Sequence, residues 1–121
     1  MLKCIVSVAA EQDIESILRW TEEQFGERAR RRYEALLAQA IVDLAENADR
    51  AGSQRRPEIA PLARTYHLWH SRKRANASVE GVEKPRHFIL FRISGSGNLE
   101  IGRVLHDSME LGRPLPSEYR S

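Results

Sequence analysis

The sequence predicts an α+β protein in which an N-terminal strand and a two-helix hairpin precede a three-stranded antiparallel meander. Apolar residues recur at helical spacing between residues 10 and 44, which is typical of amphipathic helices. After residue 63 the period changes to two, and a turn rich in glycine separates the last two apolar runs. We therefore expect one sheet packed on the two helices, followed by a short C-terminal tail over residues 108–121.

The size and composition of the chain are those of one soluble domain. It has 121 residues, of which 41% are hydrophobic, and this is enough to bury one core. Neither end carries a basic-then-apolar signal segment, and no apolar run approaches the roughly 20 residues that span a bilayer. We expect a single domain over residues 1–121, located in the cytoplasm and away from membranes. The only cysteine, Cys4, is expected in the core.

Two adjacent helices are predicted to follow a short strand. The strand is the stretch from Leu2 to Val6, which is rich in β-formers, and Ser7 after it is a suitable N-cap for the first helix. Gly26 is expected to end that helix and to turn the chain into the second, so that the two form an antiparallel hairpin. The predicted core positions are Ala10, Ile14, Ile17, Leu18, Thr21 and Phe25 in the first helix, and Ala29, Tyr33, Leu36, Leu37, Ala40, Ile41 and Leu44 in the second.

A polar loop and three strands make up the predicted second half. The loop begins near Asp49 and contains Gly52, Pro57 and Pro61, so we expect no regular element in it. The predicted strands are residues 64–70, 87–93 and 99–105, and the middle one is nearly continuous in apolar residues, as in a strand covered on both faces. Residues 71–84 are expected to form a long exposed hairpin loop, and residues 94–98 a tight turn. On the last strand, one face is predicted to carry Leu99, Ile101, Arg103 and Leu105.

Charge is distributed unevenly along the chain. Residues 1–50 hold seven Lys/Arg and ten Asp/Glu, a net charge of −3, whereas residues 51–121 hold twelve and seven, a net charge of +5. The segment from Arg55 to Arg92 alone carries +6, and all four histidines lie in the second part. This asymmetry indicates an acidic partner, either a nucleic acid or an acidic peptide. A basic face that meets only solvent is the alternative.

Several short segments, taken in order, resemble a known protein family. They are the pattern S-x-x-A-x-x-D-I-x-x-I at 7–17, GSQRRPEI at 52–59, RTYHLWHS at 64–71, PRHFILFRI at 85–93 and GRVLHDSME at 102–110, with a closing Leu-Pro at 115 and 116. Together they are similar to the RelE/ParE superfamily of toxins from bacterial type II toxin-antitoxin modules, over nearly the whole chain. The resemblance implies an antiparallel sheet, begun by the N-terminal strand and packed on a helical hairpin. It also implies a cognate antitoxin whose acidic C-terminal segment wraps the toxin.

The superfamily divides by mechanism. RelE-like members cut messenger RNA in the ribosome, which needs groups for proton transfer and a cation beside the phosphate; the candidates here are Arg103, His106 and Arg92. ParE-like members inhibit DNA gyrase by protein-protein contact and are not known as nucleases. The segment after Arg103 has no tyrosine shortly after His106, and it carries Glu110 four positions after that histidine, which resembles the ParE pattern. We therefore favour a gyrase inhibitor without catalytic residues. The alternatives are an mRNA endonuclease of the RelE kind and a non-toxic antitoxin-binding homologue.

Two tryptophans and several arginines are candidates for partner contacts. Trp20 and Trp69 lie off the predicted core stripe of their element or on its less certain face, and large exposed aromatic side chains mark interfaces. Core packing is the alternative for each tryptophan. The arginines of the basic segment are the best candidates for holding an acidic partner, above all the antitoxin. The predicted partner-binding residues are Trp20, Arg64, Trp69, Arg72, Arg74 and Arg86.

The histidines do not suggest a metal site. His67 and His70 are three positions apart, which on a strand places them on opposite faces, and neither a cysteine nor a pair of carboxylates is near them. His106 is expected to have a structural role at the end of the last strand. We predict neither a metal nor a cofactor. Self-association, as a homodimer or within a toxin-antitoxin hetero-oligomer, stays open.

Overall fold

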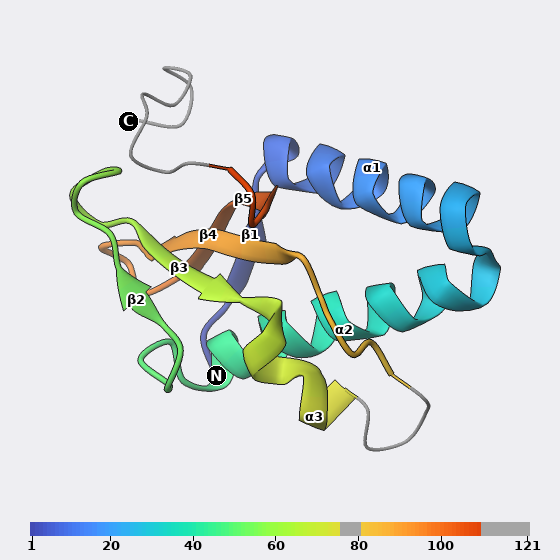
Figure 1. Ribbon diagram of the computed structural model, residues 1–121. Helices are drawn as coiled ribbons and strands as arrows, with labels where there is room; N and C mark the ends of the chain where they lie inside the picture. Colours follow the sequence, from blue (N-terminus) through green and yellow to red (C-terminus); the bar gives the residue numbers. More distant parts are fainter. Residues whose placement is uncertain (76–80, 110–121) are drawn as a thin grey trace.

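The computed structural model describes residues 1–75 and 81–109. Two long helices lie side by side next to a five-stranded sheet, which confirms the predicted α+β class (Figure 1). The sheet is mixed and has the strand order β1-β5-β4-β3-β2. The elements are β1 (Cys4–Val6), α1 (Val8–Phe25), α2 (Glu27–Glu46), β2 (Gln54–Arg55), β3 (Arg64–His67), the 3-10 turn η1 (Leu68–Ser71), α3 (Arg72–Ala75), β4 (His87–Ile93) and β5 (Leu99–His106). The predicted tail falls largely on residues 110–121, outside the described part.

Helix α1 begins at the predicted cap and is tied there to the sheet. The Ser7 hydroxyl oxygen accepts the Ala10 amide N–H at 3.0 Å, which satisfies one of the free donors of the first turn. The same hydroxyl donates to the Gly102 carbonyl on β5 at 2.8 Å. One side chain therefore both starts the helix and sets its position against β5.

The helical hairpin turns at Gly26, whose φ of 93° lies in the region that favours glycine. The predicted core stripe of α2 is confirmed at Tyr33, Leu36, Leu37, Ala40 and Leu44, which are all buried. On α1, however, the expectation that Phe25 belongs to the core is wrong, because its side chain is 68% exposed. The tip of the hairpin projects away from the sheet (Figure 1), so the last turn of α1 has no core to contact.

As predicted, β3, β4 and β5 are antiparallel neighbours, and β4 is the central strand of the sheet, but β3 is shorter than predicted and is followed by η1 and α3. The predicted face of β5 is wrong beyond its middle. Leu90 pairs with Arg103 and Phe91 with Ile101, so Gly102 forms a bulge without a direct partner. The bulge shifts the alternation by one residue, and the core therefore takes Val104 in place of Arg103.

The two edges of the sheet also differ from prediction. Strand β1 pairs with β5 in parallel, with Val6 opposite Ile101, so the sheet is not purely antiparallel. At the other edge, Gln54 and Arg55 form β2 beside β3, in a loop for which no regular element was expected. A strand of two residues is too short to leave a periodic pattern in the sequence. Cys4 is half-buried and packs on the core, and burial raises the pKa of its thiol.

The expected hairpin loop over residues 71–84 is wrong at its beginning. Strand β3 ends at His67, and residues 68–75 form η1 and α3. The reason is Asp43 on α2, which is fully buried and needs hydrogen-bond donors. Gln39 and Arg50 supply part of them, and the Ser71 hydroxyl and the Arg74 guanidinium supply the rest, so a run that looks like solvated loop folds onto α2. Residues 76–80 of the predicted loop lie outside the described part.

Candidate functional site

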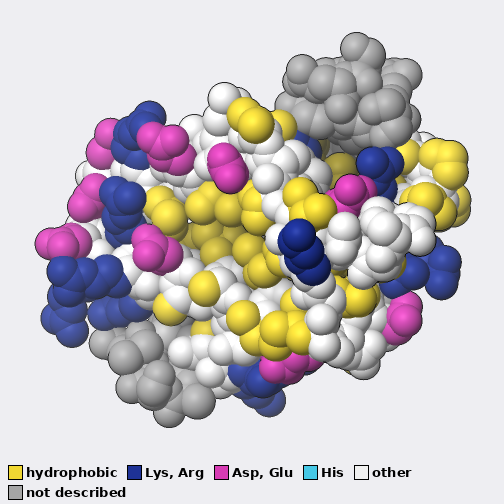
Figure 2. Space-filling model, turned by 180° about the vertical axis from the view of Figure 1, so that it is seen from behind, with side chains coloured by type: hydrophobic (Ala, Val, Ile, Leu, Met, Phe, Trp, Pro, Cys, Tyr) yellow, Lys and Arg dark blue, Asp and Glu magenta, His cyan; other side chains and the backbone are white. Residues whose placement is uncertain are grey.

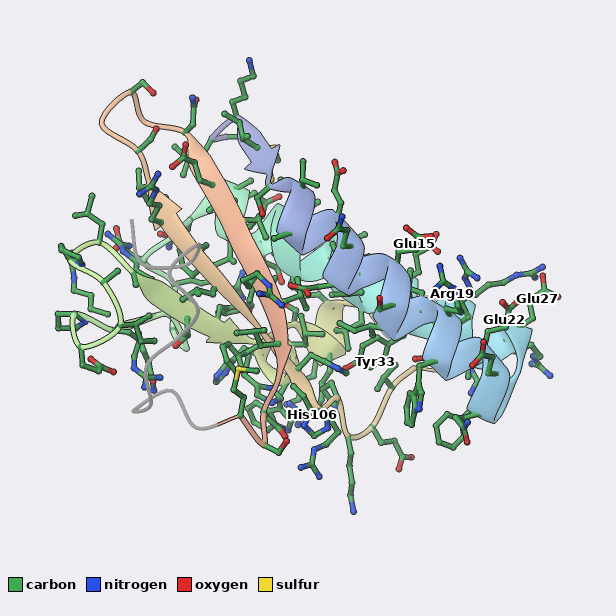
Figure 3. The ribbon with its side chains drawn as sticks, turned by 90° about the horizontal axis from the view of Figure 1, so that it is seen from above. Glu15, Arg19, Glu22, Glu27, Tyr33 and His106 are labelled. Carbon is green, nitrogen blue, oxygen red and sulfur yellow. The ribbon has the colours of Figure 1, made fainter. Side chains whose placement is uncertain are left out.

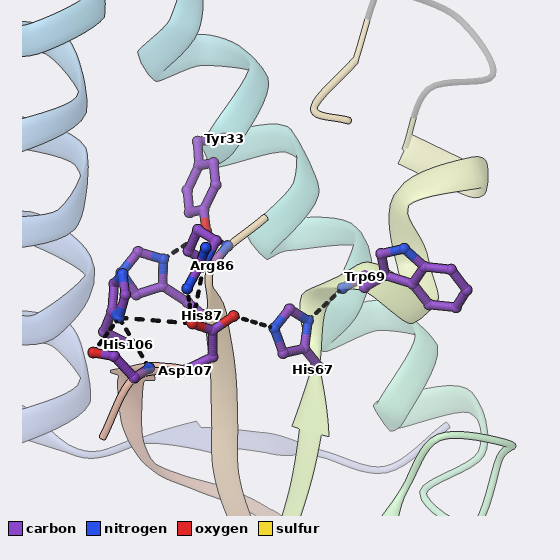
Figure 4. A network of polar contacts seen from close by, with 8 residues as sticks. Tyr33, His67, Trp69, Arg86, His87, His106 and Asp107 are labelled. Atoms are coloured by element: carbon purple, nitrogen blue, oxygen red, sulfur yellow. Dashed lines mark hydrogen bonds and ion pairs between the residues drawn. The ribbon is translucent and has the colours of Figure 1, made fainter. Parts of the chain in front are cut away.

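Three histidines and an aspartate gather where β4 begins and β5 ends. His87, the first residue of β4, lies opposite His106, the last of β5, and their rings meet edge to face at 5.3 Å. Asp107 follows immediately. Its carboxylate accepts hydrogen bonds from Nε of Arg86 at 3.0 Å and from Nε2 of His67 at 3.1 Å (Figure 4). The antiparallel register therefore brings residues from three strand ends into one cluster, called the histidine cluster below.

Tyr33 of α2 closes the buried side of the histidine cluster. Its hydroxyl oxygen accepts the Arg86 amide N–H at 3.1 Å, which leaves the hydroxyl proton to donate to Nδ1 of His87. Burial raises the pKa of Tyr33 to about 12. Burial, and next the neighbouring His106, lower the pKa of His87 to about 4, so this imidazole is neutral at pH 7. The pair is thus a neutral hydrogen-bonded contact between α2 and β4.

His67 is held in one tautomer by its two neighbours. Its Nδ1 accepts the Trp69 amide N–H at 3.0 Å and so carries no proton, while Nε2 donates to Asp107. Burial acts to raise the pKa of Asp107, but the hydrogen bonds from His67 and Arg86 outweigh it and lower that pKa. Both ring nitrogens of His67 are in use, and the imidazole ends β3 by capping η1.

Two adjoining hollows open beside the histidine cluster, of about 330 and 430 Å³. They share His67, His70 and Asp107. The first reaches toward Arg56 and Gly52, and the second toward Trp69 and Arg86. Gly52 has a φ of 99°, and a Cβ added to it would lie 2.5 Å from the His70 ring, so only glycine lets the 52–54 segment pack there. Both hollows are lined mainly by polar and basic side chains.

A larger and more apolar groove, of about 650 Å³, lies between the start of α1, the 59–63 segment and strands β4 and β5. Ile5, Val8 and Leu62 on its walls are 41%, 69% and 60% exposed. Seen from behind, hydrophobic side chains gather at the centre of the molecule, while acidic and basic side chains alternate at the hairpin tip (Figure 2). Arg92 and Arg103 are the basic residues in the groove lining.

The hairpin tip carries its own charge pairs and an aromatic pair. Figure 3 shows Glu15, Arg19, Glu22 and Glu27 along this end, away from Tyr33 and His106. The pairs are Glu15 with Arg19, Glu22 with Arg30 and Glu27 with Arg31, at 2.6–2.9 Å. Trp20, 54% exposed, meets the Phe25 ring edge to face at 5.7 Å.

The three candidate nuclease residues are divided between two regions. Arg103 contacts both carboxylate oxygens of Asp13 on α1, and Nε of Arg92 contacts Glu100 at 2.6 Å. Both arginines line the apolar groove. His106 instead belongs to the histidine cluster, where its Nδ1 accepts the Ser108 amide N–H at 3.1 Å. The register of β4 and β5 thus brings the two arginines to one groove and takes His106 away from it.

The predicted partner-binding arginines all have contacts within the chain. Arg64 pairs with Asp49 at 2.7 Å, and Arg86 pairs with Asp107 at 2.9 Å. The Arg74 guanidinium reaches buried Asp43, and the Arg72 guanidinium lies over the ring of Trp69, 3.6 Å from its centre. Trp69 is 47% exposed. Trp69, Arg72 and Arg86 lie near one another around the second hollow, whereas Trp20 is on the hairpin tip.

Sequence reasoning missed two members of the histidine cluster, Tyr33 and Asp107. Tyr33 was predicted only as a core position, and its hydroxyl partner His87 is 54 residues away. The signal for Asp107 was its place directly after the last strand, because the end of an antiparallel strand lies beside the start of its neighbour. Among residues 1–75 and 81–109, no three His, Cys, Asp or Glu side chains are arranged to hold a metal ion. In the same residues, no helix has the length and apolar character to cross a bilayer.

Residues 4–111 match the family described as the ParE toxin of the type II toxin-antitoxin system, parDE. The chain belongs to this family of ParE toxins. A search of curated proteins finds no significant match. As a ParE-family toxin, the protein has an antitoxin as its expected partner, since the family is defined by such pairs. The resemblance seen in the sequence is therefore confirmed.

Proposed function

We propose that this ParE-family toxin inhibits DNA gyrase by direct protein-protein contact, without catalytic residues of its own. We further propose that it does so in the cytoplasm, as a single domain over residues 1–121. The observation that carries the proposal is the separation of the three residues that a RelE-like nuclease would need. Arg92 and Arg103 line the groove, and His106 lies in the histidine cluster.

Cleavage of RNA by proton transfer requires a base, an acid and a cation within reach of one phosphate. Here the Arg103 guanidinium is engaged by Asp13, with both side chains only 15% exposed, and Arg92 is engaged by Glu100. Nδ1 of His106 is occupied by Ser108. These three contacts stabilise the fold and leave the side chains poorly placed for catalysis. They therefore support an inhibitor that works by protein-protein contact.

We propose the apolar groove as the place where the antitoxin tail neutralises the toxin. Its exposed walls at Ile5, Val8 and Leu62 suit the apolar side of an amphipathic segment that orders on binding. Arg92 lines the groove and pairs with Glu100, and its half-exposed side chain can exchange that partner for an acidic side chain of the tail. Because the groove exposes far more apolar surface than either hollow, it suits the apolar side of an amphipathic peptide better than they do.

The other predicted partner-binding residues differ in how accessible they are to a partner. Trp20, Trp69 and Arg86 stay candidates because each has a half-exposed side chain, and Arg72 stays a candidate because it stacks on Trp69. Arg64 and Arg74 are weaker candidates. The Arg64 side chain is only 15% exposed, and the half-exposed Arg74 side chain is engaged by the carboxylates of Asp43 and Glu46.

Two assays with the purified protein test the target. We expect it to block supercoiling by gyrase and to leave ribosome-bound messenger RNA intact, and we expect co-expression of the antitoxin to restore growth. Cutting of ribosome-bound mRNA with normal gyrase activity would overturn the proposal in favour of the nuclease. Harmless expression without antitoxin, with both assays negative, would instead indicate a homologue that only binds antitoxin.

A further inference from the structure

Trp69 and Arg72 form a stacked pair on the outside of the turn after β3. The Arg72 guanidinium carbon lies 3.6 Å from the centre of the Trp69 ring, and its Nη1 donates to the Trp69 carbonyl at 3.0 Å. In Figure 4 the indole ring is turned away from the histidine cluster and lies next to α3. Nearly half of the Trp69 surface is nevertheless accessible to solvent. A stacked cation and indole at the surface are suited to hold a planar ligand.

The turn that presents this pair is anchored on its inner side. Leu68 and Ser71, on either side of Trp69, are buried. The Ser71 hydroxyl contacts both the carboxylate of Asp43 and the hydroxyl of Tyr66, the latter at 2.8 Å. Nδ1 of His67 fixes the Trp69 amide itself. Trp69 is therefore held in place before any ligand arrives, which lowers the entropy that binding would cost.

The hollow next to Trp69 is lined by charged, imidazole and aromatic side chains, and, with the two histidines counted, its basic side chains outnumber its acidic ones. It measures about 430 Å³, and its lining includes His67, His70, Lys84 and Arg86 together with the carboxylates of Glu83 and Asp107. Among the described residues 68–75 and 81–86, five side chains are basic and only Glu83 is acidic. The basic residues are Arg72, Lys73, Arg74, Lys84 and Arg86. An aromatic ring beside several cations is the arrangement that proteins use to stack a nucleobase and neutralise its phosphates.

We propose that Trp69 and its hollow form a binding site for single-stranded nucleic acid. A base stacks on Trp69, next to the Arg72 guanidinium, and the phosphates on either side lie near Lys84 and Arg86. A duplex fits less well, because its bases are already stacked on each other and present only their edges. This site goes beyond the proposed contact with gyrase, and it does not depend on that enzyme being the target.

The same observations disfavour an acidic peptide at this site. An amphipathic peptide needs an apolar surface for its hydrophobic side chains, and the large apolar groove lies elsewhere, between α1 and the 59–63 segment. Around Trp69 the hollow is smaller than that groove and combines imidazole, ammonium and guanidinium groups with two carboxylates, while Trp69 and Pro85 supply its apolar surface. Charge alone attracts both ligands, but the exposed indole with its stacked guanidinium favours the flat base of a nucleotide.

Intrinsic tryptophan fluorescence provides a direct test, since the chain has only two tryptophans. In a Trp20→Phe background, Trp69 is the sole reporter. We expect a thymidine oligomer of about 12 nucleotides to quench its emission, and the affinity to fall as salt rises, in proportion to the phosphates contacted. A uridine oligomer of the same length and a DNA duplex are the comparison arms. A preference for either single strand supports the site and tells DNA from RNA.

Variants separate this site from general attraction by charge. Measured by fluorescence anisotropy of a labelled oligomer, Trp69→Ala and Arg72→Gln should each weaken binding about tenfold or more, and Trp69→Phe should retain most of it because the ring remains. Arg19→Gln removes one positive charge from the surface of α1 and should change the affinity less than about twofold. Circular dichroism confirms that each variant is folded.

Three outcomes would overturn the proposal. One is the absence of oligomer binding at low salt. Another is an equal loss of affinity in Arg19→Gln and Arg72→Gln, since binding would then follow net charge alone. The third is tighter binding of a polyglutamate peptide than of either oligomer, with the same dependence on Trp69, which would make this a peptide site. None of these readouts involves gyrase, so failure of the gyrase proposal leaves this test intact.

Discussion

Asp13 on α1 receives two N–H groups of the Arg103 guanidinium on β5, 90 residues away, and its Oδ2 also accepts the Val104 amide N–H at 3.0 Å. Both side chains are 15% exposed, so the contact is largely shielded from water. It lies directly after the bulge at Gly102, which turns Arg103 out of the strand alternation. Arg103, which a nuclease would place beside the phosphate, therefore links helix α1 to strand β5.

We expect Arg103→Ala to lower the free energy of unfolding by about 1–3 kcal/mol, because it leaves the shielded carboxylate of Asp13 with only one donor. Urea denaturation measures the change. Arg92→Ala is the matched control: its pair with Glu100 is more exposed and should be worth about 0–1 kcal/mol. If Arg103→Ala removed toxicity while the urea midpoint stayed the same, the arginine would have a functional role instead.

Asp43→Ala should cost about 2–4 kcal/mol of stability, because it removes a buried acceptor and leaves the Ser71 hydroxyl without it. Hydrogen exchange should speed up most in residues 68–75, since Asp43 holds η1 and α3 on α2. Glu46→Ala removes only the exposed partner of Arg74, at 3.3 Å, and should cost about 0–1 kcal/mol. Similar exchange in both variants would show that Asp43 does not anchor this segment.

The stability should depend on pH through His87. Burial first, and then the nearby His106, hold its folded-state pKa at about 4, below the ordinary value of 6.5. The unfolded chain therefore binds more protons between these values. The neutral imidazole makes its full contribution to the free energy of unfolding above pH 6.5. This contribution is lost as the pH falls toward 4, and the free energy of unfolding then changes by up to about 1.4 kcal/mol per pH unit.

Burial also lowers the pKa of His70, so this histidine contributes in the same direction. Urea midpoints at several pH values between 7.5 and 4.5, for the wild type and for His87→Asn, separate the two contributions. In His87→Asn, the urea midpoint should depend much less on pH than in the wild type. NMR titration offers a direct check on the assignment, and a His87 ring that titrates near pH 6.5 would contradict it.

Antitoxin binding should depend on the wall of the apolar groove. Leu62→Glu should weaken the affinity for the antitoxin tail at least about tenfold, because it removes exposed apolar surface and repels acidic side chains. Leu62 is 60% exposed, so stability should change by less than about 0.5 kcal/mol. Val42→Glu makes the same change on α2, outside the groove lining, and should leave the affinity unchanged. Calorimetry with a synthetic tail measures both, and equal losses would refute the groove.

Much of the fold was predictable because the relevant signals are short-range. Ser7 caps α1 and Gly26 turns the hairpin, and both requirements involve only neighbouring residues. The nearly continuous apolar run of β4 identified the central strand, because a strand covered on both faces needs it. The resemblance to the toxin superfamily was likewise carried by local segments, and the family match over residues 4–111 confirms it.

The sequence by itself determined the two long helices, their hairpin, the order of the three antiparallel strands and the family, because caps and apolar periodicities involve residues that are close in the sequence. Only the tertiary structure decided which polar residues are committed to each other: Asp13 to Arg103, Asp43 to Ser71, and His67 to Asp107, 40 residues apart. Such pairs depend on the strand register and on the bulge at Gly102, and neither of these can be predicted from residues that are neighbours in the sequence. The same long-range contacts turned an expected loop into the anchored turn that presents Trp69.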